Sequence, residues 1–148
     1  RMSDITAALG IAQLSKVARI IYLRRKNVEY LNKALSGIEE VVTPSVYDSY
    51  FHVYQLYTIL VKSGRAVRDR LCNYLVERGI STKVYFDPIH LTHFYKNVLG
   101  YKCKLPVTED LSGRVLTLPM YPTLTVEEMD YIAREIRMYF EKEKDGQN

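Results

Sequence analysis

The N-terminal segment, residues 1–37, follows a helical hydrophobic period almost without interruption and is the strongest constraint on the fold. Apolar residues recur at steps of three and four residues on both sides of Gly10 and Ser15, which predict a break or bend. Ser15 is a candidate N-cap for a second helix over residues 16–35, and Gly37 is typical of a helix end. A helix of about 20 residues spans ~30 Å, which is long for a small domain. We expect a helical spine or connector.

The remainder, residues 38–148, alternates segments of strand and helix character and predicts an α/β sandwich. β-Branched and aromatic residues predict strands at residues 54–61, 82–86 and 115–118. Helical periods or start signals predict helices at residues 65–78, 91–99 and 107–112 and from Thr125 onward. The fold class is therefore α/β (α+β), with a small sheet of about three strands and helices packed on at least one face.

Three local predictions complete this outline. Residues 38–49 are expected to form a linker. Thr125 and Glu128 have the spacing of a capping box, which opens the last helix. The charged tail, residues 141–148, is expected to fray.

Composition excludes several classes of protein. With 148 residues, 47% hydrophobic and 26% charged, the chain is the size of one globular domain, and polar residues interrupt its apolar stretches too often for a membrane span. The net charge of +4 suits anionic ligands such as phosphates, but the basic residues are dispersed and do not indicate nucleic acid. Two cysteines far apart, Cys72 and Cys103, are typical of reduced thiols in the cytoplasm.

The segment TKVYFDPIH, residues 82–90, concentrates the side chains that can bind a ligand. Its strand should end before the proline, and loops at strand ends are where α/β proteins place ligand contacts. This loop carries the rings of Tyr85 and Phe86, the Asp87 carboxylate and the His90 imidazole. A strand capped by a turn, with both rings in the core, is the alternative, and the segment alone leaves both interpretations open.

Other reactive patterns are weaker. His90 and His93 are three residues apart, but zinc would need two more ligands from Asp87, Cys103 or the distant His52, so we predict no metal site. The serines fit no nucleophile-elbow pattern, and the glycines are scattered singly, which argues against a hydrolytic triad and a phosphate loop.

Arg1 precedes a helix N-terminus at Ser3 and Asp4. An arginine beside a helix start can hold an anion. The residues alone favour a terminal side chain in solvent.

Four segments, in order, resemble motifs of the DegT/StrS family of PLP-dependent sugar aminotransferases. The segment that follows the family's large domain resembles RMSDITAALGIAQL (residues 1–14), and its His-x-Tyr-x-x-Tyr strand resembles HVYQLYTILV (52–61). Its Arg-Gly-Ile-x-Thr-x-Val-His-Tyr-x-Pro-x-His segment is similar to RGISTKVYFDPIHL (78–91), and its Leu-x-Leu-Pro-x-Tyr-Pro-x-Leu-Thr-x-Glu-Glu run to RVLTLPMYPTLTVEEMDYI (114–132). The set is specific and covers most of the chain.

The resemblance implies that residues 1–148 are a single C-terminal small domain of a longer fold-type I PLP enzyme, whose chain begins here within a motif. The lysine that binds PLP would lie upstream, because Lys16, Lys26 and the other lysines do not match it. The intact enzyme would be a cytoplasmic homodimer of polysaccharide biosynthesis. It would transfer an amino group from an amino acid such as glutamate to a nucleotide-linked keto-sugar, and this chain alone would be inactive.

The resemblance also implies substrate-binding roles for Arg1, Tyr85, Phe86 and His90, and no catalytic residue within this chain. Arg1 matches the motif arginine near the subunit junction, and His90 matches the second His of its segment. Tyr85 stands where the family often has His, and Phe86 where it often has Tyr. Phe86 lacks a hydroxyl but can stack on a sugar or base.

Two alternatives remain open at this point. The chain can belong to a sugar dehydratase or a regulatory family member that has lost the PLP lysine. It can also be a ligand-binding or interaction module without chemistry of its own.

Overall fold

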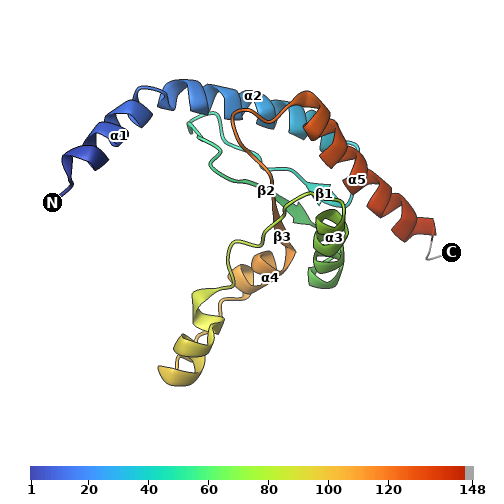
Figure 1. Cartoon of the computed structure of the whole chain (residues 1–148). Helices are drawn as coiled ribbons and strands as arrows, with labels where there is room; N and C mark the ends of the chain where they lie inside the picture. Colours follow the sequence, from blue (N-terminus) through green and yellow to red (C-terminus); the bar gives the residue numbers. More distant parts are fainter. Residues whose placement is uncertain (146–148) are drawn as a thin grey trace.

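The computed structural model describes residues 1–145 as an arch of helices above a small antiparallel sheet (Figure 1). The predicted α+β class and the sheet of three strands are confirmed. In chain order the elements are α1 (Asp4–Leu14), α2 (Val17–Leu35), β1 (Val41–Val42), β2 (Tyr57–Val61), α3 (Arg65–Glu77), the 3-10 turn η1 (Ile89–Leu91), the π-helical turn η2 (Phe94–Val98), α4 (Pro106–Arg114), β3 (Val115–Leu118) and α5 (Val126–Asp145).

Two helices, α1 and α2, form the predicted N-terminal spine and meet at an angle of 48°. The predicted cap is wrong: α2 begins after Lys16, and the Ser15 hydroxyl donates backward to the carbonyl of Ala12 at 2.9 Å. No helix within residues 1–145 is by itself long and apolar enough to cross a membrane, although α1 and α2 taken as a bent pair meet that criterion of length and composition.

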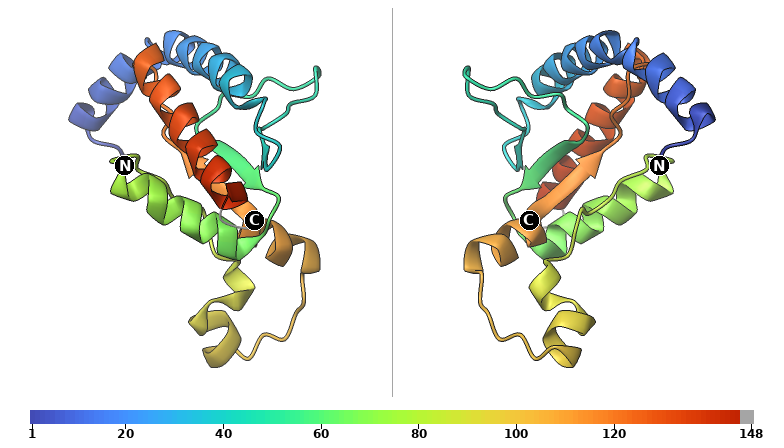
Figure 2. Two further views of the ribbon diagram at one scale, coloured as in Figure 1. Left: turned by 90° about the vertical axis from the view of Figure 1, so that its right-hand side faces the viewer. Right: turned by 90° about the vertical axis from the view of Figure 1, so that its left-hand side faces the viewer.

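The sheet has the order β1-β2-β3, with both pairings antiparallel. Tyr57 and Ile59 of β2 are buried and lie opposite Leu118 and Leu116 of β3. Side chains alternate across a strand, so these four share one face. That face is covered by α5, which lies across the sheet in both views of Figure 2. The core takes residues from α2, α3 and α5: Val28, Leu31, Leu35, Leu71, Leu75, Met129, Ile132, Ile136 and Phe140.

The strand predicted at residues 82–86 does not form, and the third strand is instead β1, within the predicted linker. Only Lys83 pairs with β3: its N–H donates to the carbonyl of Thr117 at 3.1 Å, and its carbonyl accepts from the Thr117 N–H at 2.8 Å. Beyond Lys83, Tyr85 and Phe86 are exposed and have no strand partner. β-Propensity expresses fit to a partly buried surface, which this segment lacks.

Residues 88–105, here called the finger, project from the domain as the yellow segment of Figure 1. The predicted short helix at residues 91–99 is realised as η1 and η2, which are single turns. The helix predicted after the finger is confirmed as α4, with Pro106 in its first turn. A proline fits there because its missing N–H would have no helical partner.

The predicted capping box at the start of α5 is confirmed. The N–H of Glu128 donates to Thr125 Oγ1 at 3.2 Å, and the N–H of Thr125 donates to Glu128 Oε2 at 2.8 Å. The predicted fraying is wrong for residues 141–145, because α5 runs to Asp145 and Lys144 pairs with Glu40 at 2.8 Å. Residues 146–148 of that prediction lie outside the described residues.

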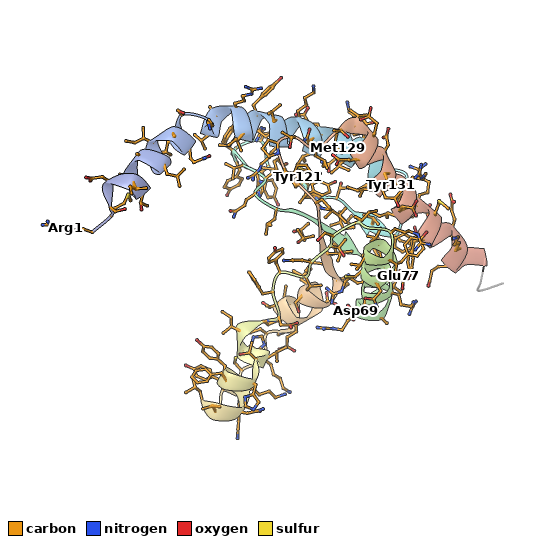
Figure 3. All side chains as sticks on the ribbon, in the orientation of Figure 1. Arg1, Asp69, Glu77, Tyr121, Met129 and Tyr131 are labelled. Carbon is orange, nitrogen blue, oxygen red and sulfur yellow. The ribbon has the colours of Figure 1, made fainter. Side chains whose placement is uncertain are left out.

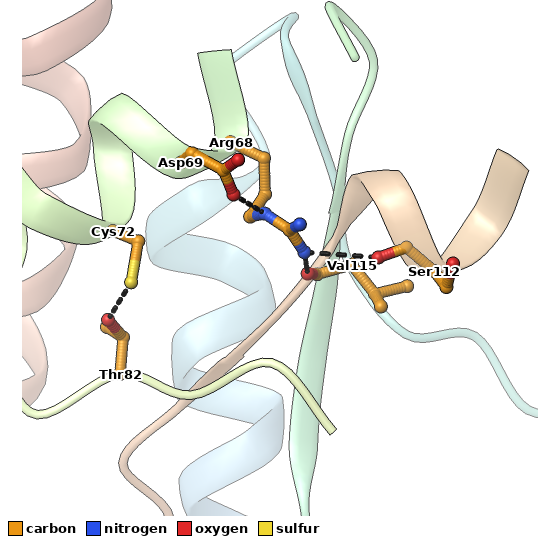
Figure 4. Close-up of polar contacts among 6 residues, drawn as sticks. All are labelled: Arg68, Asp69, Cys72, Thr82, Ser112 and Val115. Carbon is orange, nitrogen blue, oxygen red and sulfur yellow. Dashed lines mark hydrogen bonds and ion pairs between the residues drawn. The ribbon is translucent and has the colours of Figure 1, made fainter. Parts of the chain in front are cut away.

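Arg68 of α3 is a buried cation that joins three elements (Figure 4). Its side chain is 2% exposed, and Nη1 donates to the carbonyls of Val115 at 2.6 Å and Ser112 at 3.2 Å. Nε donates to Oδ1 of Asp69 at 2.7 Å. The guanidinium therefore binds the end of α4 and the start of β3 to α3.

We predict that Arg68→Met lowers the free energy of unfolding by about 2–4 kcal/mol, because buried carbonyls lose their donors. The matched control is Arg70→Met on the same helix. The pair of Arg70 with Glu143 lies at the surface, so this substitution should lower the free energy of unfolding much less. Urea unfolding of both variants measures the difference. Equal losses would contradict the role assigned to Arg68.

Candidate functional site

The sheet face opposite α5 brings together the three segments with the strongest sequence signals. Tyr57 and Ile59 turn to the core, so Thr58 between them turns to the other face. Thr58 lies opposite Thr117 of β3, and their hydroxyl oxygens are 2.9 Å apart. We call this surface the open face. It comprises Gln55, Leu56, Thr58, Lys83, Tyr85 and Thr117.

A cavity of about 270 Å³ opens on this face, and its lining draws on the segment before β2, the segment after α3 and the segment around β3. The lining residues are Gln55, Leu56, Ser81, Lys83, Tyr85, Thr117, Leu118, Pro119 and Met120. A larger cavity, about 440 Å³, lies between the end of α3 and the start of α5, but it contains none of the predicted site residues. The smaller cavity is the better candidate, because a lysine, an amide and hydroxyls converge there.

Lys83 is the cation of the open face. Its backbone is fixed by the two hydrogen bonds to Thr117, while its side chain is exposed beside the cavity. An ammonium group held at one end on a rigid backbone is suited to bind an anion such as a phosphate. Sequence reasoning missed Lys83 and Gln55. The signal for Lys83 was its position two residues before Tyr85, which places both side chains on one side of an extended chain.

Tyr85 and Phe86 extend the site at its edge. Tyr85 lines the cavity and is 37% exposed, and Phe86 is 76% exposed. Their rings meet edge to face with centroids 5.1 Å apart. The structure excludes the interpretation that these rings are in the core, because both are exposed. Exposed ring faces beside a cation are suited to stacking on a planar or sugar ring.

His90 lies at the base of the finger, and its side chain is only 9% exposed. Its Nε2 lies 3.0 Å from Oε1 of Glu109 in α4. The same oxygen accepts the backbone N–H of Leu105 at 2.9 Å. The hydrogen bond to His90, followed by that to Leu105, lowers the pKa of the Glu109 carboxyl below its ordinary value of 4.5. Glu109 joins the candidate site through this contact with His90.

Arg1 is not brought together with the other predicted residues. It precedes α1 at the outer end of the arch, away from the finger (Figure 3). Ser3 caps α1 by accepting from the N–H of Thr6 at 3.3 Å. Helix α1 buries none of its residues, and Ile5, for example, is 85% exposed. The structure therefore places Arg1 on an apolar arm rather than on the open face.

The histidines, cysteines and acidic residues considered as metal ligands or nucleophiles do not come together in one site within residues 1–145. Within residues 1–145, no group of three or more His, Cys, Asp or Glu side chains is placed to hold a metal ion. His52 instead accepts the N–H of Tyr54 on Nδ1 at 2.9 Å. Cys72 and Cys103 are free thiols, and Cys72 lies 3.2 Å from the Thr82 hydroxyl.

The described residues do not by themselves fit PLP. The cofactor needs a lysine amine in an enclosed site that excludes water. Lys83 and Lys144, which line cavities, are both exposed, and Lys144 is engaged by Glu40. The open face carries the exposed amine of Lys83, which is not enclosed as that chemistry requires.

Comparisons with known proteins place this arrangement in context. A model described as the DegT/DnrJ/EryC1/StrS aminotransferase family matches residues 1–137. A dTDP-4-dehydro-2,3,6-trideoxy-D-glucose 4-aminotransferase from Saccharopolyspora spinosa is 33% identical over 91% of this chain and 34% of its own length. A GDP-perosamine synthase from Escherichia coli O157:H7 is 31% identical over 95% of this chain and 37% of its own length.

The fold of this chain is also similar to part of a solved structure. The Streptococcus pneumoniae protein Spr1654 in its PLP-form has a TM-score of 0.83 and 26% identity, over 96% of this chain and 36% of that protein. The chain thus spans just over one third of the length of the curated relatives named above, which is 34% and 37%.

We predict that the Glu109 carboxyl titrates below 4.5 and that His90→Ala moves its midpoint back toward that value. The folded pKa is lowered, so the stabilisation is present above the unfolded pKa and is lost as the pH falls through the folded one. Carbon-13 NMR titration measures the midpoint. Glu128, whose pKa is lowered chiefly by the Thr125 backbone, is the control that should not move. An unchanged Glu109 midpoint would contradict the pairing.

Proposed function

Because this chain belongs to the DegT/DnrJ/EryC1/StrS aminotransferase family, we propose that it is the C-terminal small domain of a longer PLP-dependent sugar aminotransferase. The intact enzyme transfers an amino group from an amino acid, with glutamate as the proposed donor, to a nucleotide-linked keto-sugar. The names of the relatives from S. spinosa and E. coli support this substrate class, and their lengths support a longer chain.

The role proposed for this domain is to bind the sugar nucleotide. The observation that carries the proposal is the cavity on the open face, where Gln55 of the segment before β2 meets Lys83 and Tyr85 of the segment after α3. Lys83 supplies the positive charge for a diphosphate, and the hydroxyl and amide groups supply hydrogen bonds to a sugar. Phe86, at the edge, offers a ring face for stacking.

His90 and Arg1 have different positions in this proposal. His90 has its Nε2 held by Glu109, so Nδ1 is the nitrogen that it can present to the substrate. Arg1 lies at the end of α1, so its proposed contact with substrate belongs to the junction with the rest of the enzyme or its homodimer partner.

PLP is proposed to bind mainly to the part of the enzyme that precedes this domain. The PLP-form of the S. pneumoniae structure supports use of this cofactor. When bound, PLP supplies an electron sink for the amino-group transfer. The residues described here bind and orient the sugar nucleotide and exclude water from one side of it, and none of them holds the proton that moves.

We predict that this chain, purified alone, shows neither the visible absorbance of bound PLP nor transaminase turnover, because every lysine within residues 1–145 is exposed. The product of the complete reading frame should show both. Spectra and a coupled glutamate assay on the two proteins make the comparison. PLP absorbance with turnover from this chain alone would refute the proposal, and an intact product without PLP would favour the dehydratase or regulatory alternative.

We also predict that Lys83→Ala and His90→Ala in the intact enzyme raise the KM for the sugar nucleotide about tenfold, since one lost charge-assisted hydrogen bond is worth roughly 1.5 kcal/mol or more. PLP content should be unchanged in both. Lys62→Ala, an exposed lysine at the end of β2 outside the cavity, is the control. A KM that stays at the wild-type value in both site variants would remove the open face from the substrate site.

A further inference from the structure

The finger is held to the domain by a single carboxylate. Among the hydrogen bonds found in residues 1–145, those that join residues 88–105 to the rest of the domain all involve Glu109. Its Oε1 accepts from His90 in the first stem of the finger and from Leu105 in the second. The remaining bonds of the finger, such as Leu99 N–H to the Phe94 carbonyl at 3.0 Å, stay within it.

Glu109 itself is fixed by α4. Its backbone N–H donates to the Leu105 carbonyl at 2.9 Å, so it lies in the first helical turn, where a negative side chain is stabilised by the helix dipole. The far end of α4 is anchored by Arg68 through the carbonyl of Ser112. The carboxylate therefore has a rigid support on the domain side.

The finger has little packing of its own to replace this link. Pro88 at its start is buried, but its large apolar side chains, including Phe94 and Val98, are exposed, and its two helical turns contact chiefly one another. A segment without a core keeps its orientation only through its connections. Loss of the Glu109 bonds would free both stems and, with them, the Tyr85–Phe86 segment that precedes the finger.

We propose that Glu109 is a positioning residue for sugar-nucleotide binding, acting through His90 to hold the base of the finger against α4. This inference rests on the proposed function for its ligand and on the geometry of residues 90, 105 and 109 for its mechanism. Lys104 also lies near Glu109, and its positive charge contributes to the lowered pKa of the Glu109 carboxyl.

The test is a double-mutant cycle in the intact enzyme, with calorimetric binding of GDP and dTDP, the nucleotides named in the relatives. Glu109→Ala and His90→Ala should each weaken binding of the better nucleotide about tenfold, and the double variant should be no weaker than either. Two independent effects, giving about a hundredfold loss in the double variant, would overturn the proposal.

Glu109→Gln separates position from charge, because its amide oxygen still accepts both N–H groups. It should recover most of the affinity lost in Glu109→Ala. Tighter binding than wild type would mean that Glu109 acts by repelling the nucleotide, which overturns the proposal.

Amide hydrogen exchange at Leu105 gives a readout that needs no ligand. Protection should be lost in Glu109→Ala and kept in Glu109→Gln. If neither nucleotide binds the wild-type enzyme, the proposed function fails. Exchange at Leu105 then tests whether Glu109 holds the base of the finger against α4, and no loss of protection in Glu109→Ala overturns that role.

Discussion

The structure depends on a guanidinium group that is removed from water. Burying a charge is costly unless its hydrogen bonds are made within the protein, and Arg68 makes them to carbonyls at the end of α4 and the start of β3. This fixes where α4 ends and where the sheet resumes. Because α4 carries Glu109 and β3 carries Thr117, both the base of the finger and the inner edge of the open face take their positions from this one side chain.

Side chains are buried unevenly across this domain. This unevenness is consistent with a chain that covers only part of the length of its relatives. The core around β2, α3 and α5 is well buried, whereas α1 buries nothing and the finger exposes apolar and aromatic side chains. Apolar surface of this kind marks places where a protein meets another surface. Both extensions leave the core on the side away from α3 and α5 (Figure 1), which is the side of the open face. In the longer enzyme that we propose, these are two apolar surfaces on which its other part can close.

Sequence reasoning predicted the elements whose residues carry their own signal. The helical period of α1 and α2, the capping box at Thr125 and the β-branched runs of β2 and β3 are local, so they were found. The two valines of β1 form a strand only because β2 supplies its edge, and residues 82–86 have strand composition but only one paired residue. The site divides in the same way. Tyr85 and Phe86 were identified from their segment, while the roles of Arg68 and Glu109 come from partners distant in the sequence.

The open face has no enclosed amine placed to react with PLP, so its proposed contribution to the reaction is to orient the substrate. Short polar links fix the open face and the finger beside it: Lys83 pairs with Thr117 and Arg68 with Val115 at the open face, and Glu109 with His90 at the base of the finger. The links from Arg68 and Glu109 each contain an ionised group, which strengthens a hydrogen bond. A substrate held by such a surface is positioned to within the small movement that these links allow, and a displacement of about 1 Å at a reacting centre can cost a hundredfold in rate. In the proposed enzyme, side chains that never touch the substrate would therefore determine how well this domain serves the reaction.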